Sequence, residues 1–318
     1  MREFSVDTGY EKKRIDEFLF NMLPNVNSSV IYKAFRKRNI KVNDKRVSLS
    51  YTLSADDKVQ VYIPEEYLAQ ATDENESFIA GPEIIYEDNY IIIVSKPQGM
   101  PVHKDRNNEM RVLDNWLQIF LRARDNTLYE DDFPALCHRL DRNTGGLVLF
   151  AKDSKTLAVL EDKFRTHEIG KKYLCVVNGV PNKDFQELRG YLRKDSKRSR
   201  VFVFNNPVKG SEPIITRYRV LKKTKEYSLL EVELVTGKTH QIRAHLAFVG
   251  HPLLGDGKYG INAVNRALKL KWQALWSNEL SFNFTSPAEH LGYLKGETIL
   301  LPKIRWEGQL ENFKDIVN

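Results

Sequence analysis

Three strings of the sequence hold residue types that can act on a substrate. In HRLDRNTGGLVLFAK (138–152), Asp141 lies in a polar turn just before a glycine pair and an apolar stretch. A carboxylate in such a turn can serve as a nucleophile or as a general base. An ion pair between Arg139 and Asp141 within the turn explains the same residues without any chemistry. This string alone therefore makes Asp141 a candidate and leaves both explanations open.

The second string offers an aromatic ring, and the third offers a cation off the apolar face of a predicted helix. EIGKKYLCVVNG (168–179) contains Tyr173 at the beginning of an apolar stretch, where a tyrosine is more often a core residue than a catalyst. ELVTGKTHQIRAHLAFVGHPLLGDGKYG (233–260) contains Arg243 and three histidines. An arginine near a carboxylate would keep it charged and oriented through a contact that can be bidentate.

The three histidines of the third string raise the question of a metal centre. His240, His245 and His251 are five and six residues apart, whereas a helical zinc pair is spaced i, i+4. No run of acidic residues nearby completes a ligand set. We therefore predict no metal site, and a metal hydrolase built on these histidines is a minor alternative function.

Apolar periodicity predicts the elements that position these side chains. An Asp153-capped helix should end at Gly170, and a second helix, capped by Thr239 and ended by Gly250, should place Arg243 in its early turns and Val249 inward. Strands are expected at Tyr90–Ser95, Leu147–Ala151, Tyr173–Val177, Ile214–Leu221 and Tyr227–Val235. Since strands outnumber helices and are β-branched, we predict an α+β domain with a mixed, largely antiparallel sheet.

Charge divides the 318-residue chain into three parts. The net charge is +4 over residues 1–63, −5 over 64–80 and +8 over 81–318, giving +7 in total. We predict a small N-terminal α/β domain at 1–63, an acidic linker at 64–80 and a catalytic domain at 81–318. Two basic bodies joined by an acidic linker favour a polyanionic partner, most simply a nucleic acid.

The composition excludes several protein classes. No apolar run approaches the ~20 residues of a membrane span, and the N-terminus shows no secretory signal. Two cysteines exclude a disulfide scaffold, and no CxxC pair indicates zinc. Nucleotide-binding patterns GxGxxG and GxxxxGK[ST] are absent. We expect a cytoplasmic protein that needs no cofactor and no membrane, and that acts as a monomer.

Basic side chains gather in two segments. A helix with Ser28 at its start carries Lys33, Lys37 and Arg38 away from its apolar face, after a first helix at 14–21 that Pro24 ends. Beyond it, Asn43-Asp44 should turn one strand into the next. The second basic segment, Arg189–Arg200, holds six cations and one acid and is expected to be a loop. Either segment can be a merely solvated surface or a contact for phosphates.

Taken together, the strings resemble a known family. With KPQGMPVH (96–103), they are similar, in order over 81–302, to the RluA-type pseudouridine synthases, whose H-R-L-D-x-x-T-x-G string is highly specific. Residues 14–63 resemble the S-four-type RNA-binding domain in the R-hydrophobic-D start, the serine before a basic helix, the IKVN strand and the closing D-x-V-x-V. The first resemblance implies that Asp141 is the essential carboxylate, that Tyr173 stacks on the target base and that Arg243 pairs with Asp141.

The second resemblance implies which residues face RNA phosphates. They are Ser28, Lys33, Lys37 and Arg38 of the N-terminal domain; we add Arg139, Arg193, Lys194, Lys197 and Arg198 of the catalytic domain as RNA-binding candidates. Two positions depart from the family pattern: Gly145 replaces a usual serine, and Trp276-Ser277 stands where many members have His-Ala. Both departures bear on substrate contacts and leave the three catalytic candidates intact.

The implied reaction is the isomerisation of uridine to pseudouridine within RNA. The base must be flipped from its stack, detached, rotated and rejoined through carbon, which needs no metal or cofactor. We expect ribosomal RNA rather than transfer RNA as substrate, because the accessory domain suits structured RNA. The leading alternative is a non-catalytic RNA-binding or ribosome-assembly protein of the same fold.

Overall fold

The computed structural model describes residues 2–23, 26, 28–48, 51–64, 82–103, 112–125 and 133–304. The chain forms two compact units, Met1–Ile79 and Ala80–Asn318, each described here by itself. Apart from Pro64, the predicted acidic linker lies outside the described residues.

The first unit packs two helices on a four-stranded antiparallel sheet. Its elements are β1 (Arg2–Ser5), a 3-10 turn η1 (Thr8–Tyr10), α1 (Ile15–Met22), α2 (Ser28–Arg36), β2 (Ile40–Val42), β3 (Lys45–Arg46) and β4 (Lys58–Val61), with strand order β1-β4-β2-β3. Ile15, Phe18 and Leu19 point into its core as their spacing predicts. Asn43 and Asp44 both have positive φ and close the β2–β3 hairpin, as a two-residue hairpin turn requires.

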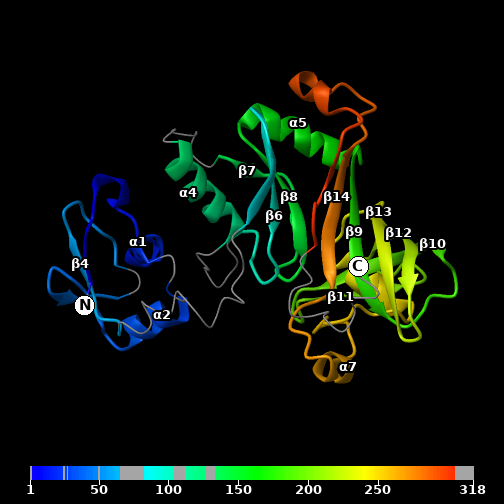
Figure 1. The fold of residues 1–318 in the computed structure, drawn as a ribbon, viewed down its shortest axis with the longest axis horizontal. Helices are drawn as coiled ribbons and strands as arrows, with labels where there is room; N and C mark the ends of the chain where they lie inside the picture. The colour runs from blue at the N-terminus through cyan, green and yellow to red at the C-terminus, as the bar shows by residue number, and fades with distance from the viewer. Residues whose placement is uncertain are drawn as a thin grey trace. The chain divides into compact units, whose positions relative to one another are not determined.

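The second unit is built on one large sheet (Figure 1). The path β11-β10-β12-β13-β9-β14-β8-β6-β5 is joined at β14 by β15 and at β8 by β7. The strands are β5 (Glu83–Glu87), β6 (Ile91–Lys96), β7 (Ala135–Leu136), β8 (Gly145–Ala151), β9 (Ile169–Asn178), β10 (Phe185–Asp195), β11 (Arg200–Phe204), β12 (Glu212–Lys223), β13 (Tyr227–Leu234), β14 (Leu275–Phe282) and β15 (Thr298–Leu300). Only β14 and β8 pair in parallel among the described strands. The predicted α+β, largely antiparallel sheet is confirmed.

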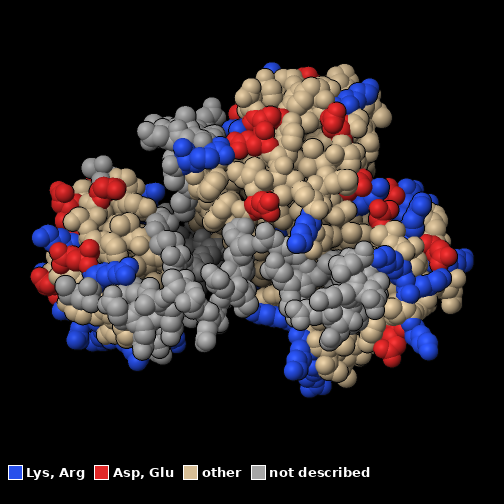
Figure 2. All heavy atoms as spheres, viewed as in Figure 1, with Lys and Arg blue, Asp and Glu red and all other residues tan. Residues whose placement is uncertain are grey.

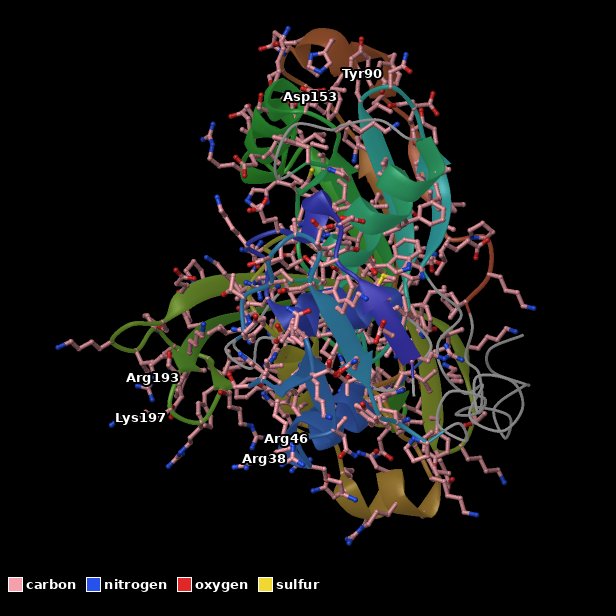
Figure 3. The ribbon with its side chains drawn as sticks, turned by 90° about the vertical axis from the view of Figure 1, so that its left-hand side faces the viewer. Arg38, Arg46, Tyr90, Asp153, Arg193 and Lys197 are labelled. Carbon is pink, nitrogen blue, oxygen red and sulfur yellow. The ribbon has the colours of Figure 1, made fainter. Side chains whose placement is uncertain are left out.

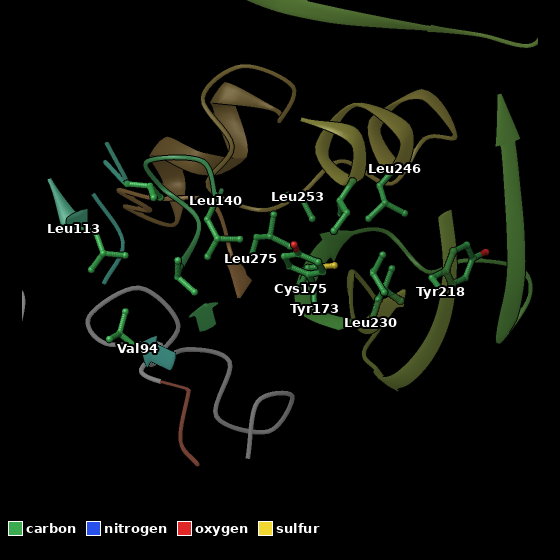
Figure 4. Close-up of a cluster of buried hydrophobic side chains, with 14 of the residues drawn as sticks. Val94, Leu113, Leu140, Tyr173, Cys175, Tyr218, Leu230, Leu246, Leu253 and Leu275 are labelled. Carbon is green, nitrogen blue, oxygen red and sulfur yellow. The ribbon is translucent and has the colours of Figure 1, made fainter. Parts of the chain in front are cut away.

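Helices cover both faces of this sheet. They are α4 (Leu113–Asp125), α5 (Ser154–Arg165), α6 (Gln241–Phe248), α7 (Asn262–Ala267) and the 3-10 segment η2 (Glu289–Leu294). Successive residues of β6 alternate between two cores, since Ile92 and Val94 pack with α4 and α6 while Ile91 and Ile93 pack with α5 and η2. Figure 4 shows part of the first core, which also holds Tyr173.

Several local expectations need correction. Asp153 does cap α5, accepting from Thr156 N at 2.8 Å, but the helix ends at Arg165, and Gly170 lies in β9. Helix α6 has His240 as its N-cap rather than Thr239, and Val249 is exposed. The basic stretch 189–200 forms paired strands β10 and β11 with a short turn, because Tyr191–Asp195 find partners in Arg200–Phe204. No described helix is long and apolar enough to cross a bilayer.

Candidate active site

Asp141 lies in the turn that connects β7 to β8. The turn closes on itself through Thr144 N, which donates to the Asp141 carbonyl at 3.0 Å. Gln98 ties it from outside by donating to the carbonyls of Asn143 at 3.0 Å and Gln273 at 2.6 Å. The Asp141 side chain is 26% exposed, so it is held in place yet reachable by a substrate.

The support beneath this turn is a buried lysine. Lys96 is fully buried, and its Nζ donates to the carbonyls of Pro97, Met100 and Arg142, each at 2.9 Å. Three acceptors match the three protons of an ammonium group. Burial lowers the pKa of Lys96 to about 7, with the Asp141 charge opposing that shift and the Arg142 charge adding to it. The lysine therefore joins the 96–100 loop to the loop that carries Asp141.

Arg243 on α6 connects two carboxylates. It donates from Nη1 to Oδ2 of Asp141 at 2.8 Å, and from Nε and Nη2 to the two oxygens of Asp256 at 2.7 and 2.9 Å. The structure thus brings Arg243 and Asp141 together, as the resemblance implies, but the bidentate contact is made to Asp256. One guanidinium edge is fixed by Asp256, and the remaining nitrogen is directed at Asp141.

Charge balance in this group favours the ionised forms. Burial opposes the charge of Arg243, but the hydrogen bonds and charges of Asp256 and Asp141 outweigh it and hold the arginine pKa above its ordinary value. Burial would raise the pKa of Asp256, which is fully buried, but Arg243 and the backbone amides of Tyr259 and Lys258 lower it. The pair is a charged, pre-positioned clamp in the resting protein.

The turn that follows Asp256 also contacts the basic hairpin β10–β11. The Tyr259 hydroxyl accepts from Val201 N at 2.9 Å and lies 3.0 Å from His240 Nδ1. The Arg243 guanidinium lies 5.3 Å from the centre of the Tyr259 ring, and Lys258 Nζ donates to the Ser199 carbonyl at 2.7 Å. Contacts thus run continuously from the hairpin to Arg243 and then to Asp141.

His240 lies at the edge of the same group. Its Nε2 is 3.8 Å from Oδ2 of Asp141. Burial lowers the pKa of His240 to about 4, against the opposing pull of the Asp141 charge. Burial therefore disfavours the protonated form of His240, and the direct hydrogen bond to Asp141 comes from Arg243.

Tyr173 lies on β9, between Val232 of β13 and Ser277 of β14. Its side chain is 5% exposed and packs in the core that includes Leu140 and Leu275 (Figure 4). Burial raises the pKa of its hydroxyl, and the nearby Asp141 charge adds to the rise. Tyr173 is thus a buried neighbour of Asp141, and its stacking on a base stays a prediction.

The two departures from the family pattern meet in the structure. Gly145 and Trp276 are direct partners in the parallel pair β8–β14, and a Cβ on Gly145 would lie 2.5 Å from Cζ3 of Trp276. Gly146, at φ 104°, passes so close to Ser277 that a Cβ would lie 2.1 Å from its carbonyl oxygen. The indole therefore occupies the space that a side chain at 145 would need, so the two departures lie in contact with each other.

The RNA-binding candidates fall in three places. Arg139 is exposed beside the Asp141 turn. Arg193, Lys194, Lys197 and Arg198 are all exposed at the end of the β10–β11 hairpin, where Figure 3 labels Arg193 and Lys197. In the first unit Lys37 and Arg38 are exposed after α2, whereas the side chains of Ser28 and Lys33 lie outside what the structure describes.

The three histidines do not form a metal centre. His245 is buried with its Nδ1 3.0 Å from Thr216 Oγ1, and His251 Nδ1 lies 3.4 Å from the Asn178 carbonyl. Within the described ranges no group of three or more His, Cys, Asp and Glu side chains could hold a metal ion.

Sequence reasoning missed three members of this site, namely Lys96, Asp256 and Tyr259. Signals for them were present: a lysine inside the apolar-flanked KPQGM segment, and an acid and a tyrosine in the glycine-bounded turn GDGKYG. Neither signal tells which distant group each side chain contacts.

The chain is similar to known proteins over most of its length. The RNA pseudouridylate synthase family matches residues 90–248. The chain is 34% identical over 260 residues to a ribosomal large subunit pseudouridine synthase C of Vibrio parahaemolyticus, covering 80% of this chain and 79% of the relative. A protein of the same description from Buchnera aphidicola is 34% identical over 287 residues, 87% of each chain.

A solved structure gives the same fold. The human RNA pseudouridylate synthase domain containing 4 superposes with a TM-score of 0.56 at 23% identity, covering 70% of this chain and 89% of that one. Its likeness concerns the fold alone. From the family match and the identity to the curated relatives, the chain belongs to the RNA pseudouridylate synthase family, as a member of the RluA type.

Proposed function

We propose that this pseudouridine synthase isomerises specific uridines of ribosomal RNA, with Asp141 as its essential carboxylate. The observation that carries the proposal is the single partly exposed carboxylate that Arg243 directs, backed by the buried Asp256. The names of the bacterial relatives, ribosomal large subunit pseudouridine synthases, support the choice of RNA.

The reaction breaks the bond between C1′ of the ribose and N1 of uracil and forms a bond between C1′ and C5. The proton on C5 is lost and N1 gains one, so no atom is transferred away. Asp141 can act as nucleophile at the sugar or the base, or as the base that removes a ribose proton. In either case the bond it forms is broken again, or the proton it takes is returned, before the product leaves. Arg243 orients that carboxylate through a charge-assisted hydrogen bond in either role.

Tyr173 would provide the face on which the flipped base rests. Base–aromatic stacking contributes about 1–3 kcal/mol, enough to hold uracil while it is detached and turned. Its position on β9, close to Asp141, supports this role.

RNA contacts would come from both units. In the second unit they would come from the exposed cations of the β10–β11 hairpin and from Arg139, which lies two residues before Asp141. In the first unit, which we propose is an S-four-type RNA-binding domain, Lys37 and Arg38 would contact phosphates, together with Ser28 and Lys33. Figure 3 labels Arg38 and Arg46 as projecting side chains of this unit.

One chain supplies every member of the site, namely Asp141, Tyr173, Arg243 and Asp256, which supports function as a monomer. Since ribosomal RNA is the proposed substrate, we place the enzyme in the cytoplasm, and we propose that it needs no metal or cofactor.

The test is pseudouridine mapping in ribosomal RNA from cells with and without the gene, with transfer RNA mapped in parallel. The proposal expects one or a few ribosomal positions to lose pseudouridine and to regain it when purified protein is added to the unmodified RNA. Unchanged maps with intact RNA binding would instead favour the non-catalytic RNA-binding alternative. Loss confined to transfer RNA would overturn the substrate assignment.

A further inference from the structure

A pocket of about 640 Å³ lies beside α7. Asp141 does not line it, but residues close in sequence to Asp141 and Asp256 do. Asn143, two residues after Asp141, forms one wall. Gly255 and Gly257, on either side of Asp256, form another, and residues 262–271 complete it. Asn265 fixes this wall, since its amide accepts from Gly255 N at 2.8 Å and donates to the Asp256 carbonyl at 3.1 Å.

The rim of the pocket is positive. Arg266, Lys269 and Lys271 line it and are exposed, and none of its lining residues is acidic. Among the described residues Arg266 and Lys269 form no ion pair, and the Lys271 ammonium lies 5.0 Å from the centre of the Trp272 ring. Figure 2 shows blue side chains gathered at the lower edge of the molecule, where Figure 1 places α7. Exposed cations around a hollow attract an anion.

Asn143, which lines the pocket, also holds an unused acceptor that is closed to solvent in the free protein. The side-chain oxygen of Asn143 is buried and makes no hydrogen bond within the described part of the chain. A buried acceptor without a partner costs free energy until a donor reaches it. A ribose 2′-hydroxyl is a donor of the right size, and it distinguishes RNA from DNA.

We propose that this pocket binds the ribose-phosphate of a nucleotide next to the target uridine. The phosphate would lie among Arg266, Lys269 and Lys271. The Asn143 side chain would turn its buried oxygen toward the pocket and accept a hydrogen bond from the 2′-hydroxyl. This inference rests on the proposed function, since it assigns a second subsite for the same RNA. Because Asn143 and Asp256 belong to the segments that place Asp141 and Arg243, a nucleotide bound here sets the position of its neighbour at the catalytic carboxylate.

The first experiment removes the charge of the rim. The triple variant Arg266→Gln/Lys269→Gln/Lys271→Gln is compared with Lys155→Gln/Arg165→Gln/Lys295→Gln, which removes one arginine and two lysines that are exposed on α5 and beyond η2. Multiple-turnover kinetics on the RNA segment that contains the mapped uridine are measured over a range of salt. We expect KM of the rim variant to rise by at least about tenfold with kcat within about twofold. Its salt slope should fall by about one, since one phosphate contact is lost.

The second experiment tests the ribose contact. RNA substrates with single 2′-deoxy substitutions around the target should include one position that raises KM of the wild-type protein about threefold or more. That penalty should vanish in Asn143→Ala, because the acceptor is gone. Circular dichroism and urea unfolding confirm that each variant is folded.

The outcomes separate this inference from the proposed function. A wild-type protein that forms no pseudouridine on any RNA refutes the proposed function. If the wild type is active but the rim variant has the same KM and salt slope as the control triple variant, the subsite is refuted. If a 2′-deoxy substitution raises KM equally in wild type and Asn143→Ala, the ribose contact is overturned. If inorganic phosphate binds at the rim without competing with RNA, the rim is a site for a free anion and the subsite is refuted.

Discussion

Replacing Asp256 by asparagine should separate the positioning of Arg243 from the chemistry of Asp141. Asp256 is fully buried and accepts two bonds from Arg243, at 2.7 and 2.9 Å, and two from the amides of Lys258 and Tyr259, at 2.8 and 3.0 Å. Asparagine keeps one oxygen and presents an NH₂ group to the other guanidinium nitrogen. The substitution removes one charge-assisted hydrogen bond and sets the new NH₂ group against an N–H of Arg243, so that two donors face each other. It also removes the negative charge of Asp256, which leaves Asp141 as the carboxylate that Arg243 contacts.

The cost follows from this geometry. Breaking a buried ion pair by altering one partner destabilises a protein by about 3–5 kcal/mol, and the retained oxygen places Asp256→Asn at the lower end. Displacement of Arg243 by about 1 Å should lower kcat about 100-fold, while RNA affinity stays within about threefold. Urea unfolding, single-turnover release of tritium from C5 of uridine and filter binding measure the three quantities. The control is Asp162→Asn, a carboxylate of an exposed pair on α5, which should change stability by less than about 0.5 kcal/mol.

If Asp256→Asn had the same turnover and the same stability as the wild type, the view that this carboxylate holds Arg243 would be refuted. A large loss of stability with unchanged kcat would make Asp256 structural only.

Three further expectations concern packing, pH and stacking. Gly145→Ala should cost about 1–3 kcal/mol because its Cβ meets the indole at 2.5 Å, and in Gly145→Ala/Trp276→His that cost should shrink by at least about 1 kcal/mol; additive costs in urea unfolding would contradict the coupling. Burial lowers the pKa of His245 to about 4, below the unfolded value of about 6.5, so its contribution to stability is complete above pH 6.5 and is lost as pH falls toward 4. Between pH 7.5 and 4.5 the wild type should lose about 2–3 kcal/mol more than His245→Asn, whereas His167→Asn, at an exposed site, should follow the wild type; equal losses in all three would refute the assignment. Tyr173→Leu should lower single-turnover kcat about 10- to 100-fold on bound RNA, and unchanged kcat would leave the ring a core residue.

Local patterns predicted much of the fold. The i, i+3, i+4 spacing of Ile15, Phe18 and Leu19 and the cap at Asp153 depend on neighbours in sequence, and the structure confirms both. The hairpin at 189–200 was expected as a loop because its exposed end carries cations on both faces, which removes the alternation that marks a strand.

The site was only partly predictable, for a physical reason. Asp141 and Arg243 lie in strings specific enough to be recognised, although 102 residues separate them. Asp256 and Lys96 act through contacts that exist only after folding: Lys96 is satisfied by three carbonyls from two segments, one of them 46 residues away. Likewise, the Gly145 and Trp276 departures look independent along the chain and become one feature when β8 pairs with β14.

The most direct test of the central claim is the turnover of Asp141→Asn on ribosomal RNA that carries the mapped uridine. The substitution keeps the shape of the side chain but removes the charge, so neither nucleophilic attack nor proton abstraction by this group is available. Single-turnover tritium release, with filter binding in parallel, should show a rate at least about 10³-fold below wild type and an RNA affinity within about threefold, because a carboxylate contributes nothing to phosphate attraction. A variant that forms pseudouridine at near the wild-type rate would contradict the account.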